Sequence, residues 1–292
     1  MSETTRDTIA DDARTYGAIR EESREFGYVG KPLDKNSELY KLVEKQGKEL
    51  GVDIEKDGIK VVVMSGSKGG ASMDFRAKTM SIDKSFLKID SVLEDPKADA
   101  NRLASLVGVI KHETQHYKDF KEGHYDHDLV DRILDPVTGK LSTIQKTGEC
   151  RADLAATGNK GFEELHELNS MMEDGHRSKT HPEGIDRFKA LIIKSEIEKE
   201  TGIALKPNDV KFNDKCEFSI TNKDKLHAIP PDVLVKAYEK AEDKARSVKE
   251  AGERIKEVLG TMQEIKDGTF VVPSALPSPQ VQQEKSTSSV GR

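Results

Sequence analysis

The residues most suggestive of chemistry are the five of the segment His112-Glu113-Thr114-Gln115-His116. Side chains four apart on an α-helix lie on one side of it, so His112 and His116 can bind a single metal ion. Zinc accepts such ligands at Zn–N distances of about 2.0–2.1 Å. Glu113 can reach a water molecule that the metal polarises, accept its proton and later deliver that proton to a leaving group. The spacing therefore predicts a zinc centre with an adjacent general base.

The alternative interpretation is a solvated pair of histidines, since chance produces this pattern in roughly one of fifty chains with this content of His and Glu. The position of the motif argues against it. A helix is expected from Asp95-Pro96 to about Lys121, and the apolar residues that precede the motif share one face of it: Leu103, Leu106, Val107 and Ile110. Histidines near this apolar face lie close to the core, where a cationic imidazole without a partner is costly. A metal ion removes that cost.

A catalytic zinc also needs a third protein ligand and an open fourth position. A third histidine six residues after His116 would complete one class of site, but that position is Glu122. The segment from Glu149 to Asp153 offers another solution, because these two acids are four apart on an expected helix. Glu149 can bind the metal, and Asp153 can accept the outer N–H of a ligand histidine. The alternative for Glu149 is an ordinary surface acid.

The elements that must position these residues indicate an α+β fold that is mostly helical. The β-branched run Ile59–Met64 predicts a buried strand, and Ser72–Phe75 with Thr79–Ile82 predict a hairpin. Helices are expected on both sides of the motif helix, including one from Ser37 to Leu50. We therefore assign residues 37–200 to the domain that carries the site.

The remaining segments differ from this domain in composition. Residues 1–36 are polar and are expected to form a loosely ordered arm. Residues 201–266 form an extension with two short strands and a long amphipathic helix from Pro230-Pro231 to Ile265, for which a coiled-coil contact is the alternative. Residues 267–292 are rich in Ser, Pro and Gln and are expected to be disordered.

Four features occur in the order found in one group of metallopeptidases. They are the hairpin with Thr79–Ile82, the HExxH helix, the Glu149–Asp153 pattern, and Thr180-His181-Pro182 followed by Arg187. In these features the chain resembles the gluzincin family that includes the HtpX heat-shock protease and the CAAX prenyl protease, together with their soluble relatives.

The resemblance implies a zincin-like fold in which Thr79–Ile82 is the edge strand that binds substrate beside the active-site helix. It also implies that His181 and Arg187 line the active site, where they orient substrate or stabilise an oxyanion. The alternative for His181 is a simple helix start, and for Arg187 a salt bridge to Asp186 or Glu183.

Composition excludes several other classes of function. The net charge of −6 comes from acidic and basic residues mixed along the chain, so no basic face indicates a nucleic-acid partner. No apolar run is long enough to span a bilayer, and the N-terminus does not resemble a signal peptide. We therefore expect a cytoplasmic location, and the alternative is export by a route that needs no cleaved signal. The two cysteines, Cys150 and Cys216, are expected to be reduced thiols of an intracellular protein.

The leading hypothesis is thus a zinc endopeptidase that binds one Zn²⁺ per chain and cleaves an extended protein or peptide substrate. The alternative is a catalytically silent protein of the same fold that binds a partner, or itself, through the C-terminal helix. Intact Glu113 argues against this alternative, because a structural zinc site does not need a base.

The other histidines carry less information. His124 and His127 lie in a polar connector, where solvated loop residues are favoured over a second metal site or a lid. No pattern gives a partner to His166, His176 or His227, so we interpret them as structural.

Overall fold

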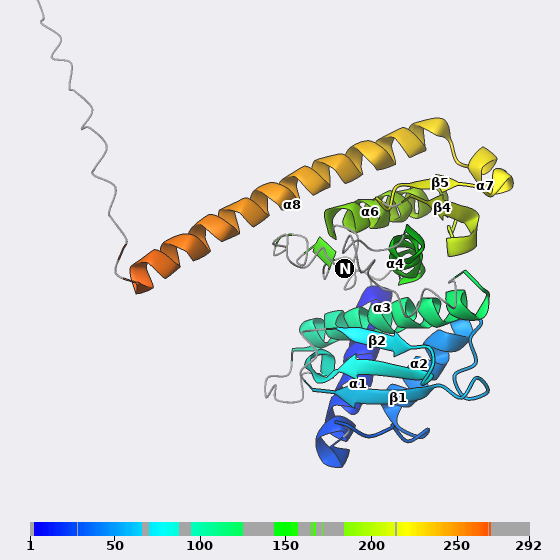
Figure 1. Cartoon of the computed structure of the whole chain (residues 1–292), viewed down its shortest axis with the longest axis vertical. Helices are drawn as coiled ribbons and strands as arrows, with labels where there is room; N and C mark the ends of the chain where they lie inside the picture. The colour runs from blue at the N-terminus through cyan, green and yellow to red at the C-terminus, as the bar shows by residue number, and fades with distance from the viewer. Residues whose placement is uncertain are drawn as a thin grey trace, which may run out of the picture. The chain divides into compact units, whose positions relative to one another are not determined.

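The structure is a computed structural model of the 292-residue chain. It describes residues 3–27, 29–65, 70–87, 95–124, 143–156, 164, 166, 167, 171, 184–213, 215–267 and 269. These residues are mostly helical and contain a small mixed sheet, in agreement with the expected α+β class (Figure 1). The chain divides into two compact units, residues 1–253 and 254–292. All the elements that position the site belong to the first.

The mixed sheet has the order β1-β3-β2, with β1 at Lys60–Met64, β2 at Ala71–Asp74 and β3 at Thr79–Asp83. The expected hairpin is present, since β2 and β3 pair antiparallel. The expectation that Thr79–Ile82 is an edge strand is wrong, because β1 pairs with β3 in parallel on its other side. The strand beside α3 is β2 instead, and no strand in the described part of the chain pairs with its outer edge.

The N-terminal residues correct another expectation. Instead of a loosely ordered arm, they form α1 (Glu3–Phe26), which packs along α3. Tyr16 and Ile19 are fully buried, and the Tyr16 hydroxyl donates to the carbonyl oxygen of Phe86 at 2.6 Å. A few large apolar residues are enough to pack this helix against the core. The polar composition of the segment therefore does not indicate disorder. Helix α2 (Glu38–Glu49) begins at Ser37, whose hydroxyl accepts from the backbone N–H of Tyr40.

The motif helix is α3 (Pro96–Lys121), close to the bounds expected from the sequence. Asp95 stabilises its start, because its carboxylate accepts from the first free backbone N–H groups of the helix. On its sides α3 contacts α1, α2, η1 (Lys84–Leu87) and β2, and its other neighbour is α4 (Thr143–Ala156). With contacts on so many sides, half or more of its residues are buried. The histidines of the motif are therefore held on a rigid element.

Two hydrophobic cores lie on the two sides of the first unit. The first core includes buried side chains of α1, α2, β1, β3 and α3. The second is formed by α4, α6 (Gly184–Thr201), the antiparallel pair β4 (Val210–Phe212) and β5 (Phe218–Ile220), and α8 (Pro231–Lys266). The short elements η3 (Pro207–Asp209) and α7 (Lys223–Ala228) connect these. Residues 201–253 thus share a core with α4 and α6 rather than forming a separate extension.

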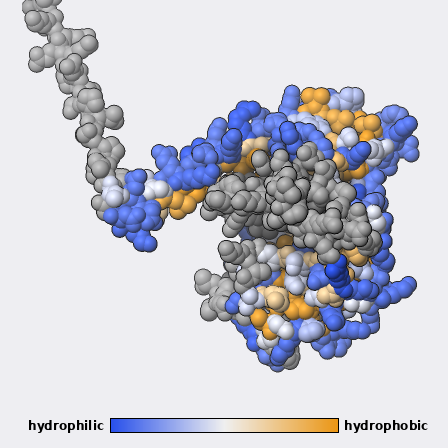
Figure 2. Space-filling view, in the orientation of Figure 1, coloured by the Kyte–Doolittle hydropathy of each residue, from blue (hydrophilic) through white to orange (hydrophobic). Residues whose placement is uncertain are grey.

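Helix α8 confirms the long amphipathic helix that the sequence predicts. Its small side chains Ala237, Ala241 and Ala245 are buried, and Lys189 of α6 forms an ion pair with Glu242 at 2.6 Å. Hydrophilic side chains cover much of α8 on the face shown in Figure 2. None of the helices that the structure describes, α8 included, is long and apolar enough to cross a membrane.

The cysteines also differ from expectation. Cys150 of α4 and Cys216 of the β4–β5 loop form a disulfide with a Cα–Cα distance of 5.5 Å, so they are not reduced thiols. They lie 66 residues apart in sequence. Their proximity results from the packing of α4 against β4, which no local pattern reveals.

Candidate metal centre

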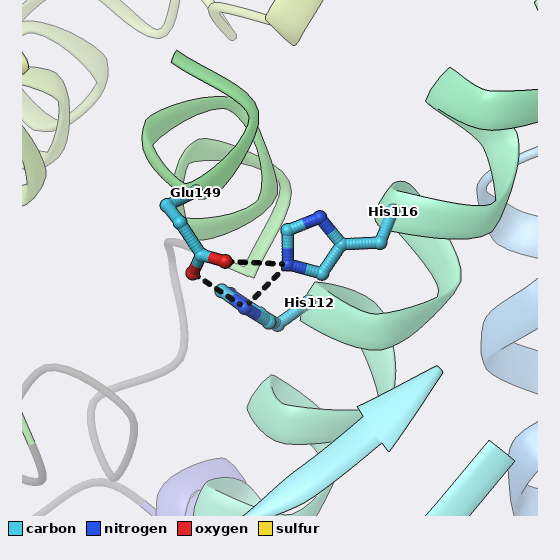
Figure 3. A group of neighbouring side chains, drawn as sticks. All are labelled: His112, His116 and Glu149. Carbon is cyan, nitrogen blue, oxygen red and sulfur yellow. Dashed lines mark hydrogen bonds and ion pairs between the residues drawn. The ribbon is translucent and has the colours of Figure 1, made fainter. Parts of the chain in front are cut away.

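Three side chains converge from two helices at the centre of the first unit. His112 and His116 project from α3 toward Glu149 of α4 (Figure 3). The two Nε2 atoms lie 2.9 Å apart, and Nε2 of His112 is 3.5 Å from Oε2 of Glu149. Nε2 of His116 is likewise 3.5 Å from Oε1 of Glu149. The structure therefore brings together the three residues that the sequence predicts as metal ligands.

The spacing of these atoms fits a tetrahedral zinc ion. Bonds of about 2.0–2.1 Å at tetrahedral angles place neighbouring ligand atoms about 3.3 Å apart. The Nε2–Nε2 distance of 2.9 Å is shorter than that value, and each Nε2 lies 3.5 Å from a different oxygen of Glu149, so the three side chains lie near the spacing that one ion requires. Two imidazoles and one carboxylate are also a ligand set that catalytic zinc sites use, with a fourth position left open. Zinc binding itself stays a prediction.

Asp153 holds the first histidine in place. Its Oδ1 lies 2.9 Å from Nδ1 of His112, which directs Nε2 of the ring toward Glu149. Burial alone would raise the pKa of Asp153, but Arg187 and His166 keep it well below its ordinary value. Asp153 is therefore charged, and it lies where the sequence places an acceptor for a ligand histidine.

The donor set is rich in negative charge. Glu113, Glu149 and Asp153 are all buried within this small region, and Arg187 supplies one positive charge. Burial would lower the pKa of His112, but hydrogen bonds to Asp153 and Glu149 raise it to about 10. A proton on this ring and a metal ion compete for the same nitrogen. The negative charge of the carboxylates stabilises a proton on His112. A bound divalent cation would neutralise that charge instead.

Glu113 lies on α3 next to the first ligand and is 7% exposed. Burial is the main cause that raises its pKa, and the charge of Glu149 adds to it, while His112, His116 and Arg187 oppose the shift. A carboxylate with a raised pKa holds a proton more readily at neutral pH. This environment suits a group that must both accept and return a proton.

Arg187 reaches the centre from α6, but its contacts differ from the expected role toward substrate. Its Nε and Nη2 donate to the two carboxylate oxygens of Asp153 at 2.5 and 2.7 Å, and Nη2 lies 3.5 Å from Oε2 of Glu149. The guanidinium therefore binds the acid behind His112. His181, the other residue implied by the family resemblance, lies outside the described residues.

His166 is a member of the centre that the sequence does not reveal. It is buried, and its Nε2 lies 3.4 Å from Oδ1 of Asp153. Burial is the main cause that lowers the pKa of His166, with Arg187 and His112 in the same direction and Asp153 opposing. No spacing in the sequence links position 166 to position 153, so only the fold reveals this contact.

A second pair missed by the sequence joins the two ligand-bearing helices. Arg151, two residues after Glu149, donates from Nε and Nη2 to Asp119 of α3 at 2.9 and 2.8 Å. Asp119 is completely buried and also accepts from Nε2 of Gln115 at 2.7 Å. Arg151 further donates from Nη1 to the carbonyl oxygen of Pro207 at 2.8 Å. This pair fixes α4 against α3 close to the three ligand side chains.

The remaining histidines lie apart from this centre or outside the described part of the chain. His124 is exposed and lies near Glu122 and Asp119, a group that we do not assign to a metal because Asp119 is bound by Arg151. His227 lies exposed on α7. His127 and His176 are outside the described residues.

Comparisons of the chain with protein-family models, with curated proteins and with solved structures each give no match. The functional interpretation therefore depends on the side chains of the centre and on the order of the motifs.

Proposed function

We propose that the protein is a zinc-dependent endopeptidase of the gluzincin type, with a zincin-like arrangement of the motif helix and the sheet edge. The observation that carries the proposal is the convergence of His112, His116 and Glu149, whose ligand atoms all lie within 4.8 Å of one another. A general base, Glu113, follows the first of these ligands directly on α3. A purely structural zinc site has no use for such a base.

Each residue of the centre has a defined task in this proposal. His112, His116 and Glu149 would hold the zinc, which when bound polarises a carbonyl group and acidifies water. Glu113 accepts a proton from the attacking water and returns it to the leaving amine. Asp153 keeps Nδ1 of His112 protonated, so that Nε2 stays available to the metal. Arg187 balances the charge of Asp153 and keeps that carboxylate in position.

The outer edge of β2 is the proposed binding surface for an extended substrate. Ala71, the first residue of β2, packs against the small cluster that contains Val109 of α3. Phe75, directly after β2, stacks on Phe120 of α3. β2 therefore runs beside α3 past both histidines. A peptide that added to this edge as a further strand would lie next to the centre through main-chain hydrogen bonds.

The disulfide bears on where the protein works. Disulfides persist in oxidising compartments and are rare in a reducing cytoplasm. Cys150 and Cys216 are 2% and 1% exposed, so their bond belongs to the second core rather than to a surface. We therefore favour a non-reducing compartment over the cytoplasmic location expected from the sequence.

The alternative function, a silent binding module, is favoured by one observation on α8. In the second unit its residues Val258, Leu259 and Met262 are 58%, 51% and 60% exposed. Such an apolar helix face is typical of a contact with another helix. It does not conflict with peptidase activity in the first unit.

Glu113→Gln tests the proposal directly. Because Glu113 is the base and not a ligand, the variant should bind about one zinc per chain and lose activity by about 10²- to 10⁴-fold. Zinc content and the cleavage of casein and of a peptide library are measured on the wild type and the variant. Glu149→Ala should lose zinc, whereas His124→Ala, at an exposed position, should keep both zinc and activity. Wild-type cleavage by Glu113→Gln would refute the mechanism.

A further inference from the structure

The disulfide begins at the residue that directly follows Glu149. Glu149 points to the two histidines of α3 (Figure 3), and Cys150 is the next residue of α4. Successive residues of a helix point about 100° apart, so Cys150 faces the second core instead. Leu154, four residues further on, shares that face and is buried in the same core. A displacement of Cys150 is therefore transmitted to Glu149 through a single peptide unit.

The other end of the disulfide lies in the loop between β4 and β5. Cys216 has a φ of +55°, in the left-handed region that disfavours residues with a side chain. Its backbone N–H donates to the carbonyl oxygen of Asn213 at 3.2 Å, and that of Asn213 donates to the carbonyl oxygen of Glu217 at 3.0 Å. A hairpin loop favours glycine where its backbone is left-handed. The bond to Cys150, rather than the loop, explains a cysteine at this position.

The disulfide is one of two ties between α4 and the chain around β4. The other is Arg151, which donates to the carbonyl oxygen of Pro207 and to Oδ1 of Asn208, both at 2.8 Å. When the disulfide is broken, this tie and the packing of Leu154 remain, so α4 stays in place with a wider range of positions. Zinc coordination tolerates only about 0.2 Å in each bond, so wider movement of Glu149 weakens metal binding.

We propose that the disulfide Cys150–Cys216 positions Glu149, so that the affinity for zinc depends on the redox state of the two cysteines. The inference rests on the proposed zinc centre and concerns the regulation of that site. The reduced protein should bind zinc about 10-fold more weakly than the oxidised protein, which is the lower end of the effect of removing support from behind a metal ligand. A chain in a reducing compartment would thus hold its metal less firmly than the same chain in an oxidising one.

Reduction by a dithiol proceeds through two thiol–disulfide exchanges. A thiolate of the dithiol attacks Sγ of Cys216, forms a mixed disulfide and releases Cys150 as a thiolate. The second thiolate of the dithiol then displaces Cys216 and closes a cyclic disulfide. The dithiol gives up two electrons and two protons, which the two cysteine thiols receive. Both sulfurs are buried, but Lys215 and Glu217 beside Cys216 are exposed, so local opening of this loop admits the reductant.

The test compares zinc affinity with stability in the full-length protein. Oxidised and reduced wild type are titrated with zinc against a competing chelator, after the dithiol, which itself binds zinc, has been removed without air. The reduced protein should bind zinc about 10-fold more weakly, and reoxidation should restore the affinity. Cys150→Ala/Cys216→Ser and Cys150→Ala/Cys216→Gly, which have no thiols, should both match the reduced protein. The variant with glycine should melt at the higher temperature, because glycine suits the left-handed backbone of residue 216.

Ile229→Ala serves as the matched control. Ile229 is buried in the second core between α7 and α8, so this variant lowers the melting temperature of the metal-free protein without breaking the disulfide. Its zinc affinity should equal that of the wild type. Unchanged affinity in the reduced protein and in both cysteine variants would overturn the coupling alone, as would an equal loss of affinity in Ile229→Ala. Failure of the oxidised wild type to bind about one zinc per chain would overturn the proposed function, and the coupling with it.

Discussion

Replacing Arg151 with alanine tests whether one ion pair holds the two ligand-bearing helices at their spacing. The variant would leave the Asp119 carboxylate completely buried, and among the described residues Gln115 would be its one remaining side-chain hydrogen-bond donor. Removing one partner of a buried ion pair costs about 3–5 kcal/mol, because the remaining charge stays out of water. The hydrogen bond to Pro207 is lost as well, which adds about 1 kcal/mol.

These magnitudes give a measurable result. In a folded unit of this size each kcal/mol lowers the melting temperature by about 2–4 °C, so Arg151→Ala should lower it by on the order of 10 °C. Zinc affinity should fall by about 10- to 100-fold, the usual effect of removing support from behind metal ligands. Thermal unfolding of the metal-free protein and competition with a chelator measure the two quantities separately.

The control lies on α3, the helix that carries Asp119. Lys121 pairs with Asp57 at 2.8 Å, but the lysine side chain is 54% exposed, so Lys121→Ala should change stability little. The double variant Arg151→Ala/Asp119→Ala should be less destabilised than the sum of its single variants by about 1–3 kcal/mol. If Arg151→Ala behaves like Lys121→Ala in both assays, the role assigned to the pair is wrong.

Two further predictions concern the second core. The carboxylate of Asp209 accepts from Lys225, Asn222 and the backbone N–H of Lys206, and these contacts outweigh burial and lower its pKa. A group whose pKa is lower in the folded than in the unfolded state stabilises the protein fully above the unfolded pKa of about 4. This stabilisation is lost as the pH falls through the pKa of the folded state. The free energy of unfolding in urea should therefore differ less between wild type and Asp209→Asn at strongly acidic pH than at neutral pH. An equal difference at the two pH values would contradict this role of Asp209. Cys216→Ser should cost about 4 kcal/mol through the loss of a cross-link between positions 66 apart, and dithiothreitol should then have no further effect on its melting temperature.

The sequence predicted those parts of the centre that depend on spacing within one helix. His112 with His116, and Glu149 with Asp153, are each four residues apart, and helix geometry alone puts each pair on one face. The contacts between helices were not predictable, because nothing local relates Arg151 to Asp119 or His166 to Asp153. Their partners are set by how α4 packs on α3.

The fold was predictable to a similar degree. The motif helix, the β2–β3 hairpin and the long α8 follow from hydrophobic periodicity and turn residues. The central place of β3 was missed because the parallel pairing with β1 joins strands separated in the chain by β2. Helix α1 was missed because its burial depends on a few residues such as Tyr16 and Ile19 in an otherwise polar segment.

The location of the centre between two cores has a consequence for allostery. His112 and His116 belong to a helix that packs into the first core, whereas Glu149 belongs to a helix of the second. Because zinc coordination tolerates only about 0.2 Å in each bond, the proposed zinc ion would select one relative position of the two cores. Coupling between two binding sites is reciprocal. A partner that binds to β4, β5 or α8 and shifts the second core would therefore change the affinity for zinc without contacting His112, His116 or Glu149.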